Sequence, residues 1–218
     1  GELKPGDMLP AERELANEHD ISRPTVRQAL RELVNKGMLF REKGKGTYVA
    51  EPKIEYGFIQ KLTTFYDDIK EKGYLLKTKI IEKEIIKANK NIANKLNINE
   101  GDEIIHLFRL RFVSGEPIVT VENFIPYELC PRLMKENLSD KSLYSIMSKK
   151  YDLIPYRAEV TLEPMIASEY DSELLNIGEG APILLMENVT YDKSDRVIDY
   201  FESRFRGDKG KVNVEIYK

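Results

Sequence analysis

Two arginines stand two positions apart in the alternating stretch "HLFRLRF", which runs from position 106 to 112. In a β-strand, Arg109 and Arg111 share one face, and guanidinium groups bind phosphate or carboxylate oxygens through paired hydrogen bonds. A hairpin through the turn "SGEP" would place Arg109 close to Thr120, with Glu122 diagonal on the same face. The carboxylate of Glu122 could then accept hydrogen bonds from hydroxyl or amine groups of the same ligand. The pattern predicts an anion-binding pocket, and a surface cluster of ion pairs is the alternative.

A second stretch, "LSDKSLYSIM", has the pattern of a helix start. Ser139 or Asp140 would cap this helix, and Ser142 would lie in its first turn. The free N–H groups and the dipole of a helix N-terminus favour anions, and Ser142 and Tyr144 add two hydroxyls. An ordinary capped helix, without a ligand, is the alternative.

Basic residues gather in a different part of the chain, between positions 22 and 49. Seven lysines and arginines stand there against two glutamates, whereas the whole chain has a net charge of −3. A local excess of positive charge in an acidic protein is typical of a nucleic-acid-binding unit. A solvated helix face is the alternative.

The apolar residues of this region predict the elements that hold the charges. Five of them recur at helical spacing, and these are Val26, Ala29, Leu30, Leu33 and Val34. Ser22 is a suitable N-cap for their helix, and a short helix with Leu15 and Ala16 facing inward precedes it. The stretch "MLFREKGKGTYVA" follows as a hairpin with a basic turn. The order of elements predicts a winged helix-turn-helix, in which the start of the second helix enters the major groove of DNA.

Composition limits the remaining possibilities. The 218 residues hold one cysteine and two histidines, so neither an internal disulfide nor a zinc site built from these residues is expected. No apolar run reaches the roughly 18 residues of a membrane helix. These features predict a cytoplasmic protein without a metal or cofactor.

Residues 58–218 read as an α+β domain with an antiparallel sheet and flanking helices. Segments typical of strands are 78–87, 104–113, 117–125, 157–167, 182–191, 196–206 and 211–217, and segments typical of helices are 64–72, 89–96, 140–150 and 168–175. The stretch "LNINEGDEIIHL" is repeated 79 positions later as "LNIGEGAPILLM". The repeat predicts two related halves of one sheet, in which Asn188 and Thr190 take the places of Arg109 and Arg111.

The N-terminal stretch "LPAERELANEHDISRPTVRQALRELVNKG", followed by "GKGT", resembles the winged-helix domain of GntR-family bacterial transcription regulators. The resemblance implies a DNA-binding domain over residues 1–50, without the helix that usually precedes this motif in the family. The DNA contacts that the helices and the hairpin turn imply are Arg13, Ser22, Arg23, Thr25, Arg27, Gln28, Gly44, Lys45 and Gly46.

After a linker at residues 51–57, residues 58–218 are similar to the UTRA effector domain of the HutC subfamily, which shares its fold with chorismate lyase. The matching stretches are "LTTFYDDIKEKG", "RLRFVSGEPIVTVENFIP", "SLYSIM" and "FRGD". The resemblance implies an effector site, and the family often has Tyr at position 205. The residues carried over are Thr64, Arg109, Arg111, Glu122, Ser142, Tyr144, Asp199 and Phe205.

Together these features predict a ligand-responsive transcriptional repressor. We expect a homodimer that binds double-stranded palindromic operator DNA and releases it when a small anionic effector, such as a phosphorylated sugar, binds. One alternative is a small-molecule enzyme related to chorismate lyase, although a winged helix has no purpose in such an enzyme. Another is a winged helix used for protein–protein contact.

Overall fold

The computed structural model describes residues 3–57, 64–139 and 141–215, and the chain divides into two compact units, residues 1–54 and 55–218. In chain order the helices and strands are α1 (Glu12–Glu18), α2 (Arg23–Asn35), β1 (Leu39–Glu42), β2 (Gly46–Val49), β3 (Ile54–Glu55), α3 (Phe65–Glu71), β4 (Leu76–Lys87), α4 (Lys90–Leu96), β5 (Glu103–Val113), β6 (Glu116–Pro126), α5 (Leu143–Tyr151), β7 (Arg157–Ile166), α6 (Glu169–Leu175), β8 (Pro182–Tyr191), β9 (Val197–Arg206) and β10 (Gly210–Lys211). Two short 3-10 helices, Tyr127–Leu129 and Pro131–Lys135, follow β6. Within these ranges, no helix is both long and apolar enough to span a membrane.

The N-terminal unit is the predicted winged helix-turn-helix. Helices α1 and α2 pack around Ala16, Val26 and Leu30, and the antiparallel hairpin of β1 and β2 closes the small core through Leu39. Ala29, which the helical spacing assigned to the buried face, is exposed. Gly44 in the turn of the hairpin has a φ of +78°, a conformation that glycine adopts at little cost.

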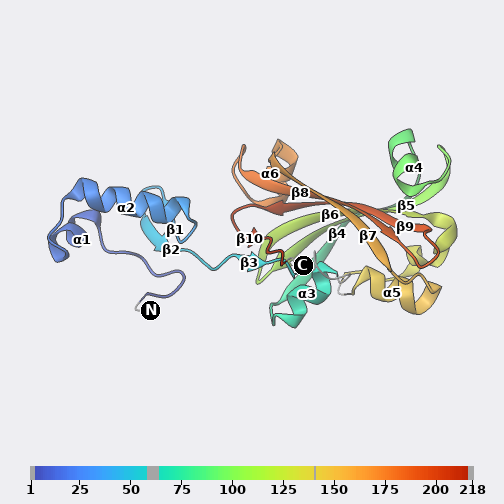
Figure 1. Ribbon diagram of the computed structural model, residues 1–218, viewed down its shortest axis with the longest axis horizontal. Coiled ribbons are helices and arrows are strands. Elements are labelled where there is room, and N and C mark those ends of the chain that lie inside the picture. Colours follow the sequence, from blue (N-terminus) through green and yellow to red (C-terminus); the bar gives the residue numbers. More distant parts are fainter. Residues whose placement is uncertain (1–2, 58–63, 140, 216–218) are drawn as a thin grey trace. The chain divides into compact units, whose positions relative to one another are not determined.

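The C-terminal unit is built on one six-stranded sheet in the order β4-β5-β6-β9-β8-β7, with every neighbouring pair antiparallel. Figure 1 shows α4 and α6 on one face of this sheet and α3 and α5 on the other. Apolar side chains on both faces are buried under these helices. The predicted α+β fold class is therefore confirmed.

The internal repeat occupies equivalent positions in the sheet. The first half runs β4-α4-β5-β6 and the second runs β7-α6-β8-β9, and β6 pairs with β9 at the centre (Figure 1). Asn97 and Asn176, the matching asparagines of the repeat, end α4 and α6 with φ values of 55° and 51°. Asparagine tolerates this left-handed conformation better than most residues, which explains why the repeat keeps it at both helix ends.

Several predicted boundaries differ from the structure. Helix α5 begins at Leu143 with Ser142 as its N-cap, so Ser139 does not cap it, and Asp140 lies outside the described residues. Of the expected strand over 211–217, only Lys211 lies in a strand, the two-residue β10, which pairs with β3 inside the expected linker; residues 212–215 form no strand, and 216–217 lie outside the described residues. Short strands at segment ends depend on tertiary pairing, which residue patterns do not specify.

Gly207 provides a test of packing at the end of β9. A Cβ at this position would lie 2.7 Å from the carbonyl oxygen of Pro182, a backbone atom that cannot rotate away. We expect Gly207→Ala to lower the free energy of unfolding by about 1–3 kcal/mol, as overpacking does elsewhere. Gly178→Ala is the matched control, because no atom lies within 4 Å of the position that its added methyl group would take. Urea unfolding of both variants checks this, and equal stabilities would contradict it.

Candidate DNA-binding and effector sites

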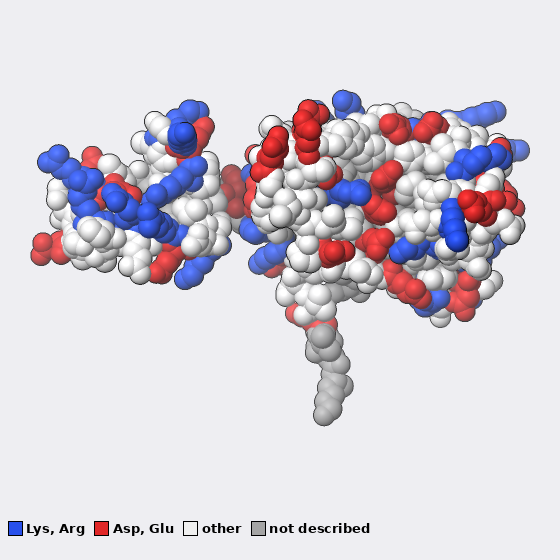
Figure 2. Space-filling view, turned by 90° about the horizontal axis from the view of Figure 1, so that it is seen from above, with Lys and Arg blue, Asp and Glu red and all other residues white. Residues whose placement is uncertain are grey.

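The N-terminal unit carries exposed arginines on α1 and α2, some free of ion pairs among the described residues and others paired with Glu12. Arg13 and Arg23 are exposed and make no ion pair with the described residues. Glu12 binds two other arginines, accepting hydrogen bonds from Arg27 at 3.0 Å and from Arg41 at 3.2 Å. The bond from Arg27 holds the pKa of Glu12 below its ordinary value. Figure 2 shows lysines and arginines gathered on the N-terminal unit, as expected of a surface that meets phosphates.

The remaining predicted DNA contacts have structural roles of their own. Ser22 caps α2, accepting a hydrogen bond from the Thr25 amide at 3.3 Å, and its hydroxyl lies 2.8 Å from that of Thr25. Gln28 donates to Glu32 along the exposed face of the helix. In the wing, Lys45 pairs with Glu42 at 2.6 Å, and Gly44 and Gly46 flank it with positive φ. These residues are exposed, so their present bonds leave them open to a duplex.

A buried polar layer lies on the face of the main sheet that α3 and α5 cover. Arg109 of β5 donates to Asn123 of β6 at 2.6 Å, and the Asn123 amide donates to both carboxylate oxygens of Asp199, at 3.1 and 2.8 Å. Tyr144 of α5 donates to Asp199 at 2.9 Å and lies 2.7 Å from the hydroxyl of Thr190. Four strands and one helix therefore converge on a single network of charged and neutral polar groups.

Both arginines of the layer are almost completely enclosed. Arg109 is 2% exposed and Arg111 is 4% exposed, and the guanidinium of Arg111 lies over the ring of Phe65, 5.6 Å from its centre. The Nε and Nη1 atoms of both guanidinium groups are buried without a hydrogen-bond partner among the described residues. Buried N–H donors without partners are costly, and an anionic group in this layer would satisfy them.

Burial shifts the ionisation of the charged groups in this layer. It raises the pKa of Asp199 to about 7, against the lowering effect of the bonds from Asn123 and Tyr144. It lowers the pKa of Arg109 to about 10 despite the attraction of Asp199. The pKa of Arg111 is also lowered, first by burial and then by the charge of Arg109. The two guanidinium groups therefore lack part of the stabilisation that water would give them, and an anionic ligand would supply it.

The N-cap residues of α3 and α5 meet beside the arginines. Thr64 caps α3 and Ser142 caps α5, and their hydroxyl oxygens lie 3.4 Å apart. Both hydroxyls donate to the carboxylate of Asp67, at 2.6 and 3.2 Å. The two caps therefore have hydrogen-bond partners within the chain, whereas Nε and Nη1 of both arginines have none among the described residues.

Glu122 does not share a face with the arginines, and that prediction is wrong. Arg109 pairs with Val121, because Ile118 forms a β-bulge between the pairs Arg111–Val119 and Phe112–Pro117. One extra residue moves every following side chain to the opposite face. Glu122 consequently lies on the face that α4 and α6 cover, where its Oε1 atom is 2.8 Å from His106 Nε2. Thr120 pairs with Leu110, so the expected contact between Arg109 and Thr120 is also wrong.

The same bulge places Asn123, a residue that sequence reasoning missed, on the face of the sheet that carries the arginines. Asn123 takes the place expected for Glu122 and connects Arg109 to Asp199. Thr190, singled out only as the counterpart of Arg111 in the repeat, bonds to Tyr144 in the same layer. Phe205 is buried against Phe65, with ring centres 5.8 Å apart, and so supports the ring beneath Arg111. The internal repeat could have predicted that Thr190 belongs to this layer. No sequence signal predicted Asn123, because the bulge changes which side chains share a face.

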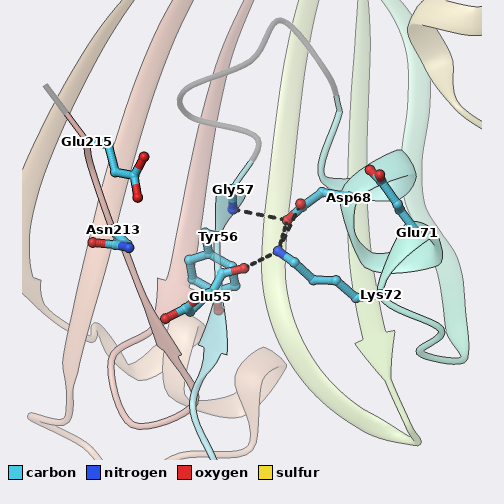
Figure 3. Close-up of a pocket in the computed structure, with 8 residues that line it drawn as sticks. All are labelled: Glu55, Tyr56, Gly57, Asp68, Glu71, Lys72, Asn213 and Glu215. Carbon is cyan, nitrogen blue, oxygen red and sulfur yellow. Dashed lines mark hydrogen bonds and ion pairs between the residues drawn. The ribbon is translucent and has the colours of Figure 1, made fainter. Parts of the chain in front are cut away.

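Helix α3 also contacts the chain at the start of the C-terminal unit. Figure 3 shows Lys72 directed at the carboxylate of Asp68 and at the backbone carbonyl of Glu55, with both of which it bonds. Asp68 in turn accepts a hydrogen bond from the Gly57 amide at 3.2 Å. The residues that make these bonds line an open pocket, and Asn213 and Glu215 lie on its opposite side. One helix therefore contacts the buried polar layer at its N-terminal end and this segment at its last turn.

The two units define a DNA-binding domain followed by a domain with an enclosed polar layer, as in a transcriptional regulator. A family model described as "UTRA domain" matches residues 71–211, and one described as "Bacterial regulatory proteins, gntR family" matches residues 1–49. The chain belongs to the gntR family of bacterial regulatory proteins and carries a UTRA domain. It is accordingly a regulator, and the prediction that it is not an enzyme is confirmed.

Named relatives and solved structures agree with this membership. The chain is 37% identical to the "HTH-type transcriptional repressor NagR" of Bacillus subtilis (strain 168), over 96% of this chain and 85% of that protein. It is 34% identical to the "Mannosyl-D-glycerate transport/metabolism system repressor MngR" of Escherichia coli (strain K12), over 98% and 88%. The crystal structure of PhnF from Mycobacterium smegmatis superposes with a TM-score of 0.74 at 27% identity, over 99% of this chain and 94% of that chain.

Arg23 tests the DNA-binding surface. Because its guanidinium is exposed at the start of α2, we expect Arg23→Ala to weaken binding to a selected palindromic duplex by about 1–3 kcal/mol per half-site. Gel shifts at several salt concentrations measure both the affinity and its salt dependence. Arg132→Ala, which removes an exposed arginine of the C-terminal unit, is the control and should leave affinity unchanged. Unchanged binding by the Arg23 variant would show that α2 does not read DNA.

Asp199 tests the charge balance of the buried layer. The unfolded chain ionises this group at a pKa of about 3.9, whereas the folded pKa is about 7. Between these values the folded state holds more protons, so the contribution of Asp199 to stability falls as pH rises from about 4 to 7 and then levels off. Asp199→Asn removes this dependence. The melting temperature of the variant should therefore rise relative to that of the unmodified chain as the pH is raised from 5 to 8.

The control for this test is Glu128→Gln, which removes an exposed carboxylate from the same unit. Its melting temperature should keep a constant difference from that of the unmodified chain over the same pH range. If Asp199→Asn also keeps a constant difference, Asp199 does not change its protonation state in this interval.

Proposed function

We propose that this chain is a transcriptional repressor that binds a palindromic operator as a homodimer and releases it when a small phosphorylated sugar binds the polar layer. The observation that carries the proposal is the pair of enclosed arginines whose Nε and Nη1 atoms have no hydrogen-bond partner in the described part of the chain. Guanidinium N–H groups are the donors that bind phosphate oxygens through paired hydrogen bonds. Ser142 and Thr64 lie beside them, and a phosphate would compete with Asp67 for the hydrogen bonds of their hydroxyls.

The rest of the layer has the character needed for the sugar part of the ligand. Asn123, Asp199, Tyr144 and Thr190 offer both donors and acceptors, the mixture that sugar hydroxyls require. The names of similar proteins point in the same direction. Besides the mannosyl-D-glycerate repressor, a "Probable fructoselysine utilization operon transcriptional repressor" of Escherichia coli (strain K12) is 26% identical over 99% of this chain.

The homodimer is supported by the outer strand of the sheet. Strand β7 pairs with β8 on one side only, and its apolar residues Val160, Leu162 and Ile166 are exposed. A row of exposed apolar side chains on an edge strand is unusual for a surface in water. A second copy of the chain would cover it, and two recognition helices would then read the two halves of a palindrome.

Helix α3 supplies a route from the ligand to the DNA-binding unit. Its N-terminal residues Thr64 and Phe65 face the arginines, and its last turn holds Glu55 and Gly57 through Lys72 and Asp68. Glu55 follows the N-terminal unit directly in the chain. A ligand that repositions α3 would therefore alter the segment that leads to the DNA-binding unit, and it shifts the equilibrium only by its different affinities for the two arrangements.

The test is calorimetry of hexose phosphates, with the unphosphorylated sugars as controls, in the presence and absence of the selected duplex. A phosphorylated sugar should bind, its parent should not, and the duplex should weaken its binding by the factor by which the sugar weakens DNA binding. Equal sugar affinities with and without DNA would rule out control by that ligand. Binding of the parent sugar alone would place the anion site elsewhere.

The double variant Arg109→Asn, Arg111→Thr tests the arginines themselves. The second half of the repeat carries Asn188 and Thr190 at these places, so the sheet should fold and still bind the duplex. Loss of two charge-assisted interactions, at roughly 1.5–3 kcal/mol each, should weaken sugar phosphate binding by a few orders of magnitude. A variant that unfolds would favour the alternative of a structural ion cluster, and full sugar binding would remove both arginines from the site.

A further inference from the structure

The opposite face of the main sheet carries a second cluster of ionisable groups, centred on His106. Three glutamates surround this histidine, Glu82 and Glu84 from β4 and Glu122 from β6. Figure 2 looks onto this side of the C-terminal unit, where α4 and α6 lie, and shows acidic side chains gathered between them. His106 itself is 7% exposed, whereas the side chains of Glu82 and Glu84 are 51% and 56% exposed.

The hydrogen bond to Glu122 determines which ring nitrogen of His106 carries no hydrogen when the imidazole is neutral. Nε2 lies 2.8 Å from Glu122 Oε1, and a carboxylate can only accept, so Nε2 carries the hydrogen. Nδ1 is buried and has no hydrogen-bond partner among the described residues. It faces Glu82 Oε2 at 3.7 Å and Glu84 Oε1 at 3.6 Å. In a neutral imidazole this nitrogen would present a lone pair to two carboxylates, an arrangement that needs a positive occupant.

Both distances from Nδ1 exceed that of a direct hydrogen bond and lie nearer to the separation of two ligands of one metal ion. An N–H···O hydrogen bond joins atoms about 2.7–3.2 Å apart, and both separations from Nδ1 are longer. Two ligands of one tetrahedral ion, with bonds of about 2.0–2.1 Å, are separated by roughly 3.3–3.4 Å. The ligand atoms of Glu82, Glu84 and His106 all lie within 4.8 Å of one another, so small rotations of two exposed glutamates would close the site.

We propose that His106 Nδ1, Glu82 and Glu84 bind a divalent cation of the zinc class, with Glu122 orienting the imidazole from behind. One imidazole and two carboxylates suit Zn²⁺ and its neighbours Mn²⁺, Co²⁺ and Ni²⁺. A carboxylate that accepts from the far nitrogen of a metal-binding histidine is the usual outer partner. The cysteine and histidine count argued against zinc, but this site draws most of its ligands from glutamates.

The position of the site indicates what the cation would do. Strand β4 is an edge strand, and its register with β5 shifts between Ile80 and Glu82, next to the first ligand. A cation held by Glu82 and Glu84 on one strand and His106 on the other would join the two strands directly after this irregularity. We therefore assign it a structural role, so that the ion should raise the melting temperature.

The test uses the full chain, freed of any affinity tag and treated with a chelator, and titrates it with ZnCl₂ in a calorimeter. One ion per chain should bind, and Co²⁺ should give the visible absorption of a bound site. Glu82→Gln and Glu84→Gln should each weaken Zn²⁺ binding by at least the roughly 10- to 100-fold that loss of an outer partner costs. Both residues are exposed, so neither variant should lose its fold, and circular dichroism confirms this.

Two matched controls accompany these variants. Glu103→Gln removes an exposed glutamate of β5 that pairs with Lys87, and it tests for a general effect of charge. His19→Gln removes the other histidine of the chain and should leave the affinity unchanged. Absence of saturable Zn²⁺ binding, or equal affinity in the Glu84→Gln variant, would overturn the proposal and leave a proton as the occupant. DNA and sugar phosphates take no part in the measurement, so its result is independent of the proposed function.

Discussion

The C-terminal unit depends on one costly feature, the burial of two guanidinium groups between a β-sheet and its covering helices. Removing a charge from water is unfavourable unless hydrogen bonds and opposite charges replace the lost solvent. The chain provides this only in part, through Asn123 and Asp199 for Arg109 and through the ring of Phe65 and the charge of Asp67 for Arg111. Natural proteins break the rules of local consistency mainly where function requires it. This incomplete replacement of solvent around the guanidinium groups is the strongest physical indication that the layer binds a ligand.

The two units handle positive charge in opposite ways. In the N-terminal unit the arginines stay in water, where Glu12 restrains two of them at little energetic cost. In the C-terminal unit Arg109 and Arg111 are enclosed, so each interaction there is stronger and each missing partner is more costly. An exposed set suits a polyanion that meets many cations at a surface. An enclosed set suits a small anion that must be recognised by a few exact contacts.

Sequence reasoning predicted the fold and several residues that the structure brings together in the polar layer, and its errors have identifiable causes. Helical spacing, the hairpin glycines and the repeat predicted both units, because each signal is local to a few neighbouring residues. The face of Glu122 was wrong because one bulged residue, Ile118, reverses the alternation of the strand that follows. Asn123 was missed for the same reason. The role of Ser142 as the helix cap depends on where α5 begins, which the competing caps nearby left open.

The repeated halves have a consequence for the direction in which a molecule can sit in the layer. Duplication of a β-α-β-β unit places β5 and β8 at equivalent positions on either side of the central pair, β6 and β9. The two halves carry different residues at the positions of the arginines, with Arg109 and Arg111 in the first half and Asn188 and Thr190 in the second. A scaffold with near-twofold symmetry thus encloses a strongly polarised interior. A ligand with one charged end and one neutral end would therefore have a single favourable orientation in this layer.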